Sequence, residues 1–311
     1  MPNMKLPYQN GQVPALQGGL ALNDLIGASD EKVNSYRKAL DFHGIQAQLI
    51  REGSHDELVG DCPFYDCPSF VENKPDKFRM RPDTGQWRCF VCGRDGNVHS
   101  FVREVHRNSL EQTTERQLLD LVALRKGAVG VEELKEMKIA FNPNTKEWSI
   151  PAYSLEGKLS NLYIWRQSYS ESGKPFLQLL ATPGLKQLPY GLNRLRSGTD
   201  RPILLLEGHF DYLAMMTLLR LCGNSNEYDL LASPGAFPKG FAKLFNGRKL
   251  MMLGDNDAAG NSMMNGVIAM MKEQAVIPTL VKRIVWPKTL PQKFDVSDVI
   301  TSLPNDLRRK K

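Results

Sequence analysis

The sequence predicts a multidomain protein in which a small β module rich in cysteine, a helical linker, an α+β segment and an α/β unit follow one another. Four of the five cysteines lie between positions 62 and 92. Alternating apolar and polar residues begin near position 141, whereas short continuous apolar runs separated by helix-like segments begin near position 201. The first pattern is typical of half-buried strands and the second of a buried parallel sheet. A chain of 311 residues is long enough for more than one domain.

Composition and charge exclude several classes of protein. Hydrophobic residues make up 41% of the chain and charged residues 24%, which excludes a collagen-like or a globally disordered chain. No apolar run approaches the roughly 20 residues that span a bilayer, and the N-terminal stretch lacks the apolar core of a secretion signal. We therefore expect a cytoplasmic protein that contacts no membrane. Its net charge of +6 favours a polyanionic partner.

The N-terminal part divides into an arm and a cysteine-bearing domain. Residues 1–28 are rich in Gly, Pro, Asn and Gln without periodicity, and we expect a flexible arm there. We assign residues 29–108 to the cysteine-bearing domain. It is expected to open with a helix over 29–42, for which Ser29 is the N-cap.

Two helices are predicted to form the linker over 109–140. The first begins at Ser109, which forms a capping box with Gln112, and ends at Gly127. A shorter helix follows over 131–138.

Residues 141–200 have the period-two pattern of a β-hairpin. Two strands are predicted within residues 148–165, joined by a turn at Glu156-Gly157. The alternation places Tyr163 and Trp165 on one face of the second strand.

Residues 201–288 alternate apolar runs with helical segments, which predicts an α/β unit with helices on both faces of a parallel sheet. The expected strands are 203–206, 229–232, 249–253 and 279–285. The expected helices are 211–221, 238–245 and 259–274. The remaining residues, 289–311, hold further acidic residues and a basic tail.

The clustered cysteines predict a zinc site. Two pairs with short internal spacing occur, separated from each other by twenty-one residues: Cys62 with Cys67, and Cys89 with Cys92. Zinc prefers four such ligands in a tetrahedron, and four thiolates leave no open position for catalysis, so we expect one structural zinc per chain. His55, Asp66 and His99 are alternative ligands, any of which would replace one cysteine.

Basic and aromatic residues are interleaved around the second cysteine pair. Residues 71–107 contain eight Lys or Arg against five Asp or Glu, together with Phe78, Trp87 and Phe90. This combination suits single-stranded nucleic acid, through phosphate contacts and base stacking. The alternative for Trp87 and Phe90 is packing within the small core of the module.

Acidic residues follow three of the predicted elements of the C-terminal part. They are Glu207, Asp255, Asp257, Asp295 and Asp298. The carboxyl ends of parallel strands meet at one edge of a sheet, and carboxylates gathered there repel one another unless cations lie between them. We therefore predict a site for Mg²⁺ or Mn²⁺, which would in turn hold phosphate oxygens.

These motifs carry a family resemblance. The segments LLLEGHFDYLAMM, LGDNDAAGN and KFDVSDVI resemble the TOPRIM domain of primases and topoisomerases, and CPFYDCPSF with WRCFVCGRDGNVHSFV resembles the zinc ribbon of primases. Together with IPAYSLEGKL and LPYGL between them, they make residues 58–300 similar to DNA primases of the bacterial and bacteriophage type (DnaG-like). The chain departs from the family at Tyr65, where a histidine or cysteine is usual, so that Cys67 must serve as the ligand. No helicase P-loop occurs in the sequence.

The resemblance implies a DNA-directed RNA polymerase that makes short primers on single-stranded DNA from ribonucleoside triphosphates. It implies that Glu207, Asp255 and Asp257 are catalytic, with Glu207 either a base or a metal ligand. Basic residues that face template or nucleotide in the family correspond to Arg166, Lys174 and Lys186. A separate replicative helicase is the expected partner. Because Asp211 lies in the first helical turn after Glu207-Gly208, where the helix dipole favours a negative charge, we expect it to cap the helix rather than to bind metal.

Two other functions stay open at this point. Recombination mediators also combine a four-cysteine zinc site with a TOPRIM domain, yet they bind DNA without catalysis. A TOPRIM nuclease would use the same metal ions to direct water rather than a ribose hydroxyl.

Overall fold

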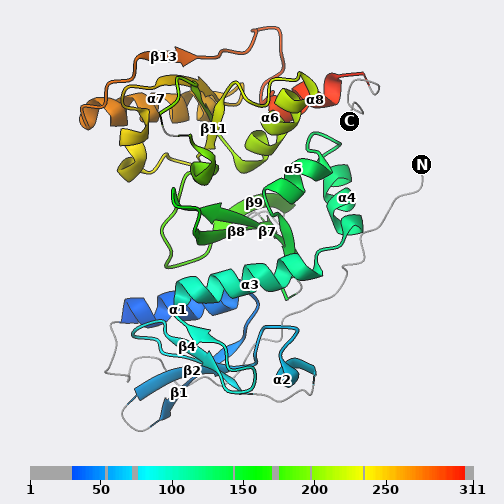
Figure 1. The fold of residues 1–311 in the computed structure, drawn as a ribbon, viewed down its shortest axis with the longest axis vertical. Helices are drawn as coiled ribbons and strands as arrows, with labels where there is room; N and C mark the ends of the chain where they lie inside the picture. The colour runs from blue at the N-terminus through cyan, green and yellow to red at the C-terminus, as the bar shows by residue number, and fades with distance from the viewer. Residues whose placement is uncertain are drawn as a thin grey trace.

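The computed structural model describes residues 30–52, 55–71, 76–142, 144–169, 175–196, 198–233 and 235–304, and the predicted arm and basic tail lie outside this part. Two antiparallel sheets and one parallel sheet follow one another along the chain. Figure 1 shows them stacked along the longest axis of the molecule, with the N-terminal sheet at the bottom and the parallel sheet at the top. Within the described residues, no helix has the length and apolar character needed to cross a membrane.

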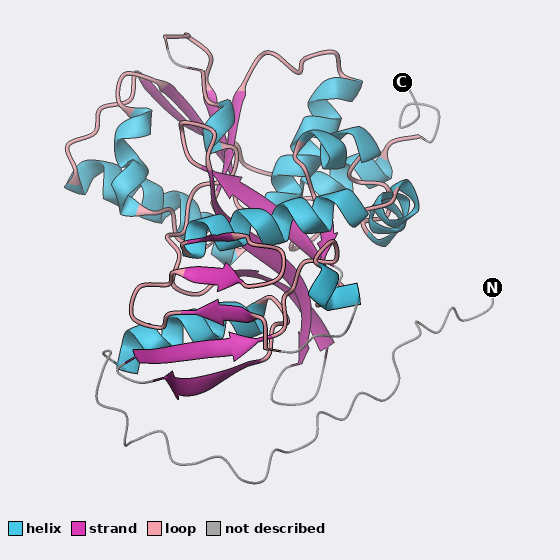
Figure 2. Cartoon of the chain, turned by 60° about the horizontal axis from the view of Figure 1, so that its bottom comes forward, coloured by secondary structure: helices cyan, strands magenta, loops and turns pink. Residues whose placement is uncertain are grey.

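The N-terminal sheet has five strands in the order β1-β2-β3-β4-β5, all antiparallel. Its strands are β1 (Ala47–Glu52), β2 (His55–Gly60), β3 (Phe78–Met80), β4 (Trp87–Cys89) and β5 (Asp95–Gly96). The helices beside it are α1 (Asp30–Phe42), α2 (Pro68–Val71) and α3 (Val98–Gln112). Figure 2 shows α1 and α3 beside this sheet. The predicted first helix is confirmed to within a residue, although Ser29 lies outside the described residues.

The helix predicted to start at Ser109 was placed wrongly. Ser109 lies inside α3, fully buried, with its hydroxyl donating to the Val105 carbonyl oxygen at 2.8 Å. The helix start is five residues later, where Thr114 and Gln117 form the capping box of α4 (Glu115–Leu124). The sequence offered two capping boxes in succession, and burial of Ser109 against the core decided between them. The expected boundary between residues 108 and 109 therefore falls within α3.

The central sheet has the order β6-β7-β8-β9 and is antiparallel. Its strands are β6 (Ala140–Asn142), β7 (Glu147–Tyr153), β8 (Leu159–Tyr169) and β9 (Pro175–Ala181), preceded by the short helix α5 (Val131–Glu136). The predicted hairpin is confirmed, with its turn at Gly157, whose φ of +74° favours glycine. α3 packs against both this sheet and the N-terminal one, since Leu159 and Leu162 of β8 share a hydrophobic core with Phe101 and Val102 of α3.

The C-terminal sheet is parallel, with the order β11-β10-β12-β13. Its strands are β10 (Ile203–Leu206), β11 (Asp229–Ala232), β12 (Lys249–Leu253) and β13 (Leu280–Arg283). The helical elements are α6 (His209–Leu221), the 3-10 helix η3 (Lys239–Phe245), α7 (Ala258–Glu273) and α8 (Val296–Ser302), after a 3-10 turn η2 (Leu192–Arg194).

The two faces of the parallel sheet are buried differently. Leu204 and Leu206 face the core that contains α6, whereas Ile203 and Leu205 face the core that contains α7 and η3. Helices on both faces were predicted and are confirmed. The burial of β13 was predicted wrongly, because its residues are exposed along the edge of the sheet. The segment 238–245 is a 3-10 helix rather than an α-helix, and α8 was not predicted.

Candidate zinc and acidic sites

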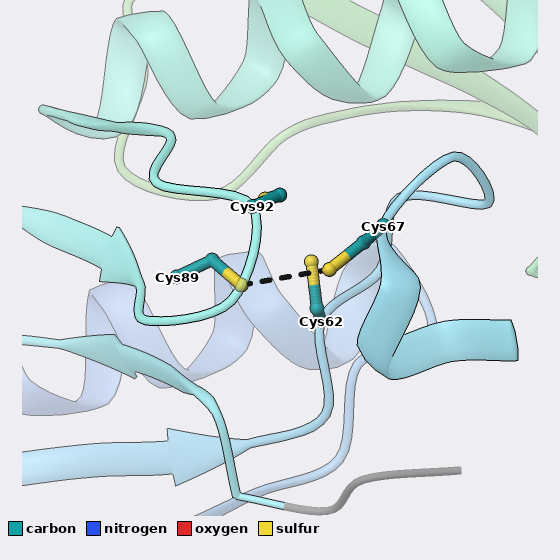
Figure 3. A group of neighbouring side chains, drawn as sticks. All are labelled: Cys62, Cys67, Cys89 and Cys92. Carbon is teal, nitrogen blue, oxygen red and sulfur yellow. Dashed lines mark hydrogen bonds between the residues drawn. The ribbon is translucent and has the colours of Figure 1, made fainter. Parts of the chain in front are cut away.

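The four cysteines of the two predicted pairs come together. The sulfur atoms of Cys62, Cys67, Cys89 and Cys92 all lie within 4.8 Å of one another, and Figure 3 shows the side chains converging from two loops. The sulfurs of Cys67 and Cys89 are 3.7 Å apart. A tetrahedron with zinc–sulfur distances of about 2.3 Å has edges of roughly 3.8 Å, so this spacing fits zinc.

Two tight turns hold these thiols in place. Gly93 has φ of +73° and its backbone N–H donates to the Cys89 carbonyl oxygen at 3.0 Å, which brings Cys92 back beside Cys89. On the other side, the Cys67 N–H donates to the Phe64 carbonyl oxygen at 2.9 Å, and the Ser69 hydroxyl lies 2.9 Å from the Cys67 sulfur. A hydroxyl that donates to sulfur stabilises the thiolate that a metal requires.

The alternative ligands are placed elsewhere or are not described. Asp66 forms an ion pair with Arg94, and its Oδ1 accepts from that guanidinium at 2.8 Å. His99 is an exposed residue of α3 and does not join the cysteine group. The side chain of His55 lies outside the described part. Tyr65, at the position where the family carries a ligand, is exposed and donates its hydroxyl to Glu111 at 3.3 Å.

Burial raises the pKa of two of the thiols. The pKa of Cys62 is far above its usual value, and that of Cys92 rises to about 11. Burial is the main cause in both cases, and the neighbouring sulfurs add to it against a backbone hydrogen bond that lowers the pKa. At neutral pH these thiols are therefore protonated in the absence of a cation. A divalent cation has to displace their protons in order to bind.

An open cavity of about 530 Å³ lies on the other side of the small sheet. Phe90 projects into solvent there with 60% of its surface exposed, and the guanidinium carbons of Arg79 and Arg88 each lie 5.5 Å from its ring centre. Trp87, by contrast, is only 3% exposed, stacks on Phe78 and donates its indole N–H to the Asn97 carbonyl oxygen. Of the two aromatic residues in question, Trp87 belongs to the core and Phe90 is available to a ligand.

Three carboxylates from separate elements meet at the carboxyl edge of the parallel sheet. Oxygen atoms of Asp211, Asp255 and Asp295 all lie within 4.8 Å of one another. Asp211 is in the first turn of α6, Asp255 follows β12, and Asp295 precedes α8. We call these three residues the acidic cluster.

The negative charges of the acidic cluster repel one another. Burial raises the pKa of Asp255 to about 8, reinforced by the negative charges of Asp211 and Glu207. The pKa of Asp211 rises to about 7, first through burial and then through Asp295, while the nearby guanidinium of Arg125 acts in the opposite direction. Half-buried carboxylates at this spacing form a set of hard oxygen ligands that suits Mg²⁺ or Mn²⁺.

Glu207 holds the backbone of Asp255, a member of the acidic cluster, in place. Its Oε2 accepts a hydrogen bond from the Asp255 backbone N–H at 3.1 Å. Gly260 makes this close approach possible, because a Cβ at that position would lie 2.6 Å from the Asp255 nitrogen and 3.0 Å from the Glu207 oxygen.

Two of the predicted metal ligands serve as helix caps. The Asp257 carboxylate accepts from the Gly260 N–H at 2.9 Å as the N-cap of α7. Asp298 forms a reciprocal capping box with Asp295 at the start of α8. Asp211 was assigned by sequence to a helix N-terminus, and the structure also places its carboxylate within the acidic cluster. The sequence signal for this placement was the short separation of Asp211 from Glu207, which directly follows β10 and precedes Asp211 by four residues.

Arg125 beside the acidic cluster was not predicted from the sequence. It is the C-cap of α4 and its guanidinium carbon lies 4.4 Å from the Phe210 ring centre and 5.9 Å from that of Trp165. Its Nη2 also lies 3.5 Å from the Ser297 hydroxyl oxygen. A cation held in this way offsets part of the negative charge of Asp211 and Asp295.

The three predicted template-binding or nucleotide-binding residues have different surroundings. The Arg166 guanidinium donates to both Glu147 carboxylate oxygens, at 2.8 and 3.0 Å, so that a ligand would have to compete with this ion pair. Lys186 is exposed and its Nζ lies 4.9 Å from the Phe241 ring centre. Lys174 lies outside the described residues.

Comparison with known proteins supports a zinc site at the four cysteines. Residues 29–126 match the family of the CHC2 zinc finger. The DNA primase of Mycolicibacterium smegmatis is 32% identical over 110 residues, which cover 35% of this chain and 14% of that protein. The DNA primase of Enterococcus faecalis is 26% identical over 157 residues, 50% of this chain and 23% of that protein. The chain thus spans about a seventh of the first relative and a quarter of the second.

Solved structures of primases are also similar to this chain. The match to the zinc-binding and RNA polymerase domains of the Aquifex aeolicus primase covers 88% of this chain and 82% of that structure. The sequence identity is 18% and the TM-score is 0.42. The E. coli primase catalytic core covers 68% at 12% identity, with a TM-score of 0.48 over 78% of its own length. The sequence matches confirm the resemblance of the zinc-binding part of the chain to DnaG-like DNA primases. Together with the four-cysteine cluster, the zinc finger match identifies a structural zinc site.

Proposed function

We propose that the chain is a DNA primase, a template-directed RNA polymerase that makes short RNA primers on single-stranded DNA. The observation that carries this proposal is the acidic cluster at the carboxyl edge of a parallel sheet, in a chain whose zinc-binding segment matches that of DNA primases. The curated relatives are DNA primases.

Asp211, Asp255 and Asp295 would hold Mg²⁺ or Mn²⁺, and Asp257 would join them where its capping bond permits, whereas Asp298 is engaged in the capping box of α8. A divalent cation bound there supplies positive charge to the triphosphate oxygens and to the attacking ribose hydroxyl. Glu207 acts as a positioning residue, because its carboxylate fixes the backbone of Asp255. Arg125 offsets the charge of the cluster before a cation binds.

Template binding belongs to the zinc-binding module in this proposal. The exposed ring of Phe90, flanked by Arg79 and Arg88, offers a stacking surface for a base and cations for the adjoining phosphates. Residues 29–112, up to the end of α3, would thus be the zinc-binding domain, joined through a linker over 113–140 to a catalytic part. That part comprises residues 141–200, a TOPRIM domain over 201–288 and the last acidic motif. Arg166, Lys174 and Lys186 stay proposed contacts to template or nucleotide, and a separate replicative helicase stays the proposed partner.

The product formed from a single-stranded template distinguishes the proposed function from its alternatives. Purified protein is incubated with single-stranded DNA, four ribonucleoside triphosphates and Mg²⁺. Oligoribonucleotides whose formation requires the template support a primase. Bound but unchanged DNA would instead indicate a binding protein of the recombination-mediator kind, and degraded DNA would indicate a nuclease.

A further inference from the structure

A second basic cavity lies where α3 meets the central sheet. It has a volume of about 620 Å³, within the range of roughly 300–1,000 Å³ that is typical of small-molecule sites. Its walls come from α3, from the turn before β6 and from the β7–β8 turn. Figure 1 shows α3 lying between the N-terminal and central sheets. We call this hollow the α3 cavity.

The lining of the α3 cavity is cationic and contains no carboxylate. Arg103 and Arg107 lie one turn apart on α3, whereas Lys138 and Lys158 come from the two turns. Arg107 is already paired with Glu104 and Glu111. Among the described residues, Arg103, Lys138 and Lys158 have no carboxylate within ion-pair distance, and all three are exposed. Three cations from three segments thus border one hollow whose own lining holds no carboxylate, although Glu156 lies near enough to Lys158 to interact with its charge.

A buried histidine lines the same cavity. His106 is only 5% exposed, and neither ring nitrogen has a hydrogen-bond partner within the described structure. Burial and the charge of Lys138 lower its pKa to about 3, so the ring is neutral at physiological pH and offers one donor and one acceptor. A buried polar group without a partner costs stability, and a ligand that displaces the groups covering the ring would provide the missing partner.

An aromatic and apolar wall completes the site. The half-buried ring of Tyr153 lies 5.9 Å from Lys138 Nζ, and Leu110 and Leu159 also line the cavity. A planar ring beside unpaired cations is the combination that binds a base together with its phosphate.

We propose that the α3 cavity binds one nucleotide unit, with its phosphate against Arg103, Lys138 and Lys158 and its base against Tyr153. His106 contributes a hydrogen bond to the same unit. The shared chemistry is a phosphorylated nucleotide, presented as a free nucleotide or as one unit of a single strand. The site is separate from the acidic cluster and does not depend on the proposed primase activity.

Binding to the zinc-loaded full-length protein without added Mg²⁺ or Mn²⁺ tests this proposal, because metal-dependent binding at the acidic cluster is then absent. The two probes are ATP and a fluorescein-labelled twelve-residue oligothymidylate. The variant carries Lys138→Gln and Lys158→Gln. The matched control carries Lys249→Gln and Lys272→Gln, which remove two exposed lysines at the start of β12 and in the last turn of α7.

The cavity variant is expected to bind at least one probe about ten-fold more weakly than the control does. A loss with the oligonucleotide alone assigns the site to a strand, and a loss with ATP assigns it to a free nucleotide. For the strand, the slope of log affinity against log salt should fall by about 1.4, at roughly 0.7 per phosphate contact. Equal affinities of cavity variant and control for both probes would overturn the proposal.

His106→Phe separates ligand binding from a structural role. Because the imidazole has no partner in the described structure, replacing it with an apolar ring is expected to leave the melting temperature unchanged or higher. Probe affinity should still fall several-fold. Unchanged affinity, whatever the melting temperature, would contradict the role given to His106.

Discussion

The Glu207 carboxylate accepts a hydrogen bond from the backbone N–H of Asp255 at 3.1 Å, across the ends of two adjacent parallel strands. This bond fixes the loop after β12 relative to the turn after β10. The loop in turn carries Asp255 toward Asp211 and Asp295. Glu207 therefore positions Asp255, and the acidic cluster depends on how the two strand ends are held together.

Asp255→Asn should stabilise the zinc-loaded protein in buffer without added Mg²⁺ or Mn²⁺. The pKa of Asp255 is about 8 in the folded chain, whereas its ordinary value is 3.8, so the folded state loses stability as pH rises between these values. The gain from the substitution should be absent below about pH 4 and greatest above pH 8. Thermal unfolding across this pH range measures it. A melting temperature lower than that of the wild type at pH 8 would contradict mutual repulsion in the cluster.

Asp211→Asn should weaken Mn²⁺ binding, whereas Asp298→Asn should leave it nearly unchanged. The first substitution removes a carboxylate of the acidic cluster, whereas the second keeps a side-chain oxygen at N3 of α8 that can accept from the Asp295 backbone N–H. Electron paramagnetic resonance of free Mn²⁺ gives both affinities. Equal losses in the two variants would place Asp298 among the ligands.

Removal of zinc should unfold the N-terminal module. Elemental analysis is expected to find one zinc per chain, and a strong chelator should lower the melting temperature because metal binding contributes to folding. Cys67→Ser should abolish zinc binding. Cys222→Ser is the control, since Cys222 is exposed and lies outside the cysteine group. Full zinc content in the Cys67 variant would show that another ligand replaces it.

Phe90→Ala should weaken binding of single-stranded DNA by roughly ten-fold, because stacking on one aromatic ring contributes about 1–3 kcal/mol per base. The ring is 60% exposed, so that the fold should tolerate its loss. Tyr65→Ala removes another exposed aromatic ring of the same module and serves as the control. Fluorescence anisotropy with a labelled oligonucleotide measures both. A similar loss in both variants would argue against a specific role of Phe90.

His209→Phe should reduce the sensitivity of the protein to acid. Burial lowers the pKa of His209 to about 3 from 6.5, so below pH 6.5 the unfolded chain takes up a proton that the folded chain does not. Stability is therefore lost as pH falls from 6.5 toward 3. The ring packs between Tyr163 and Tyr190, at 4.6 and 4.4 Å, and its nitrogens have no partner in the described residues, so phenylalanine should fit. The pH slopes of unfolding free energy should differ by up to about one proton. Identical slopes would refute the assignment.

The regular elements and the cysteine cluster were predictable because each depends on local pattern. The spacing of the cysteine pairs, the alternation over 147–165 and the apolar strands all reflect short-range periodicity. Ser109 was misassigned because Ser109 and Thr114 are both suitable caps, and only tertiary burial distinguishes them. The strand β13 was predicted, but its exposure at the sheet edge was missed because its apolar residues follow the same pattern as a buried strand.

The composition of the acidic cluster was predictable only in part. Sequence patterns identify carboxylates near strand ends, but they do not show which of these carboxylates form hydrogen bonds with a helix N-terminus. Asp257 is the N-cap of α7 and Asp298 completes the capping box of α8, whereas Asp295 is the N-cap of α8 and still joins the cluster, which Asp211 reaches from the first turn of α6. Arg125 comes from α4, more than eighty residues before Asp211, so its approach depends on tertiary packing alone.

Template-dependent incorporation of labelled ribonucleotides by the wild type and by Asp255→Asn tests the central claim most directly. The assay contains single-stranded DNA, Mg²⁺ and zinc-loaded protein, with DNA binding measured in parallel to show that the variant is folded. The wild type is predicted to form oligoribonucleotides, and the variant to form them roughly 100-fold more slowly with DNA binding retained. Equal rates of synthesis in the two proteins would contradict the catalytic role of the acidic cluster.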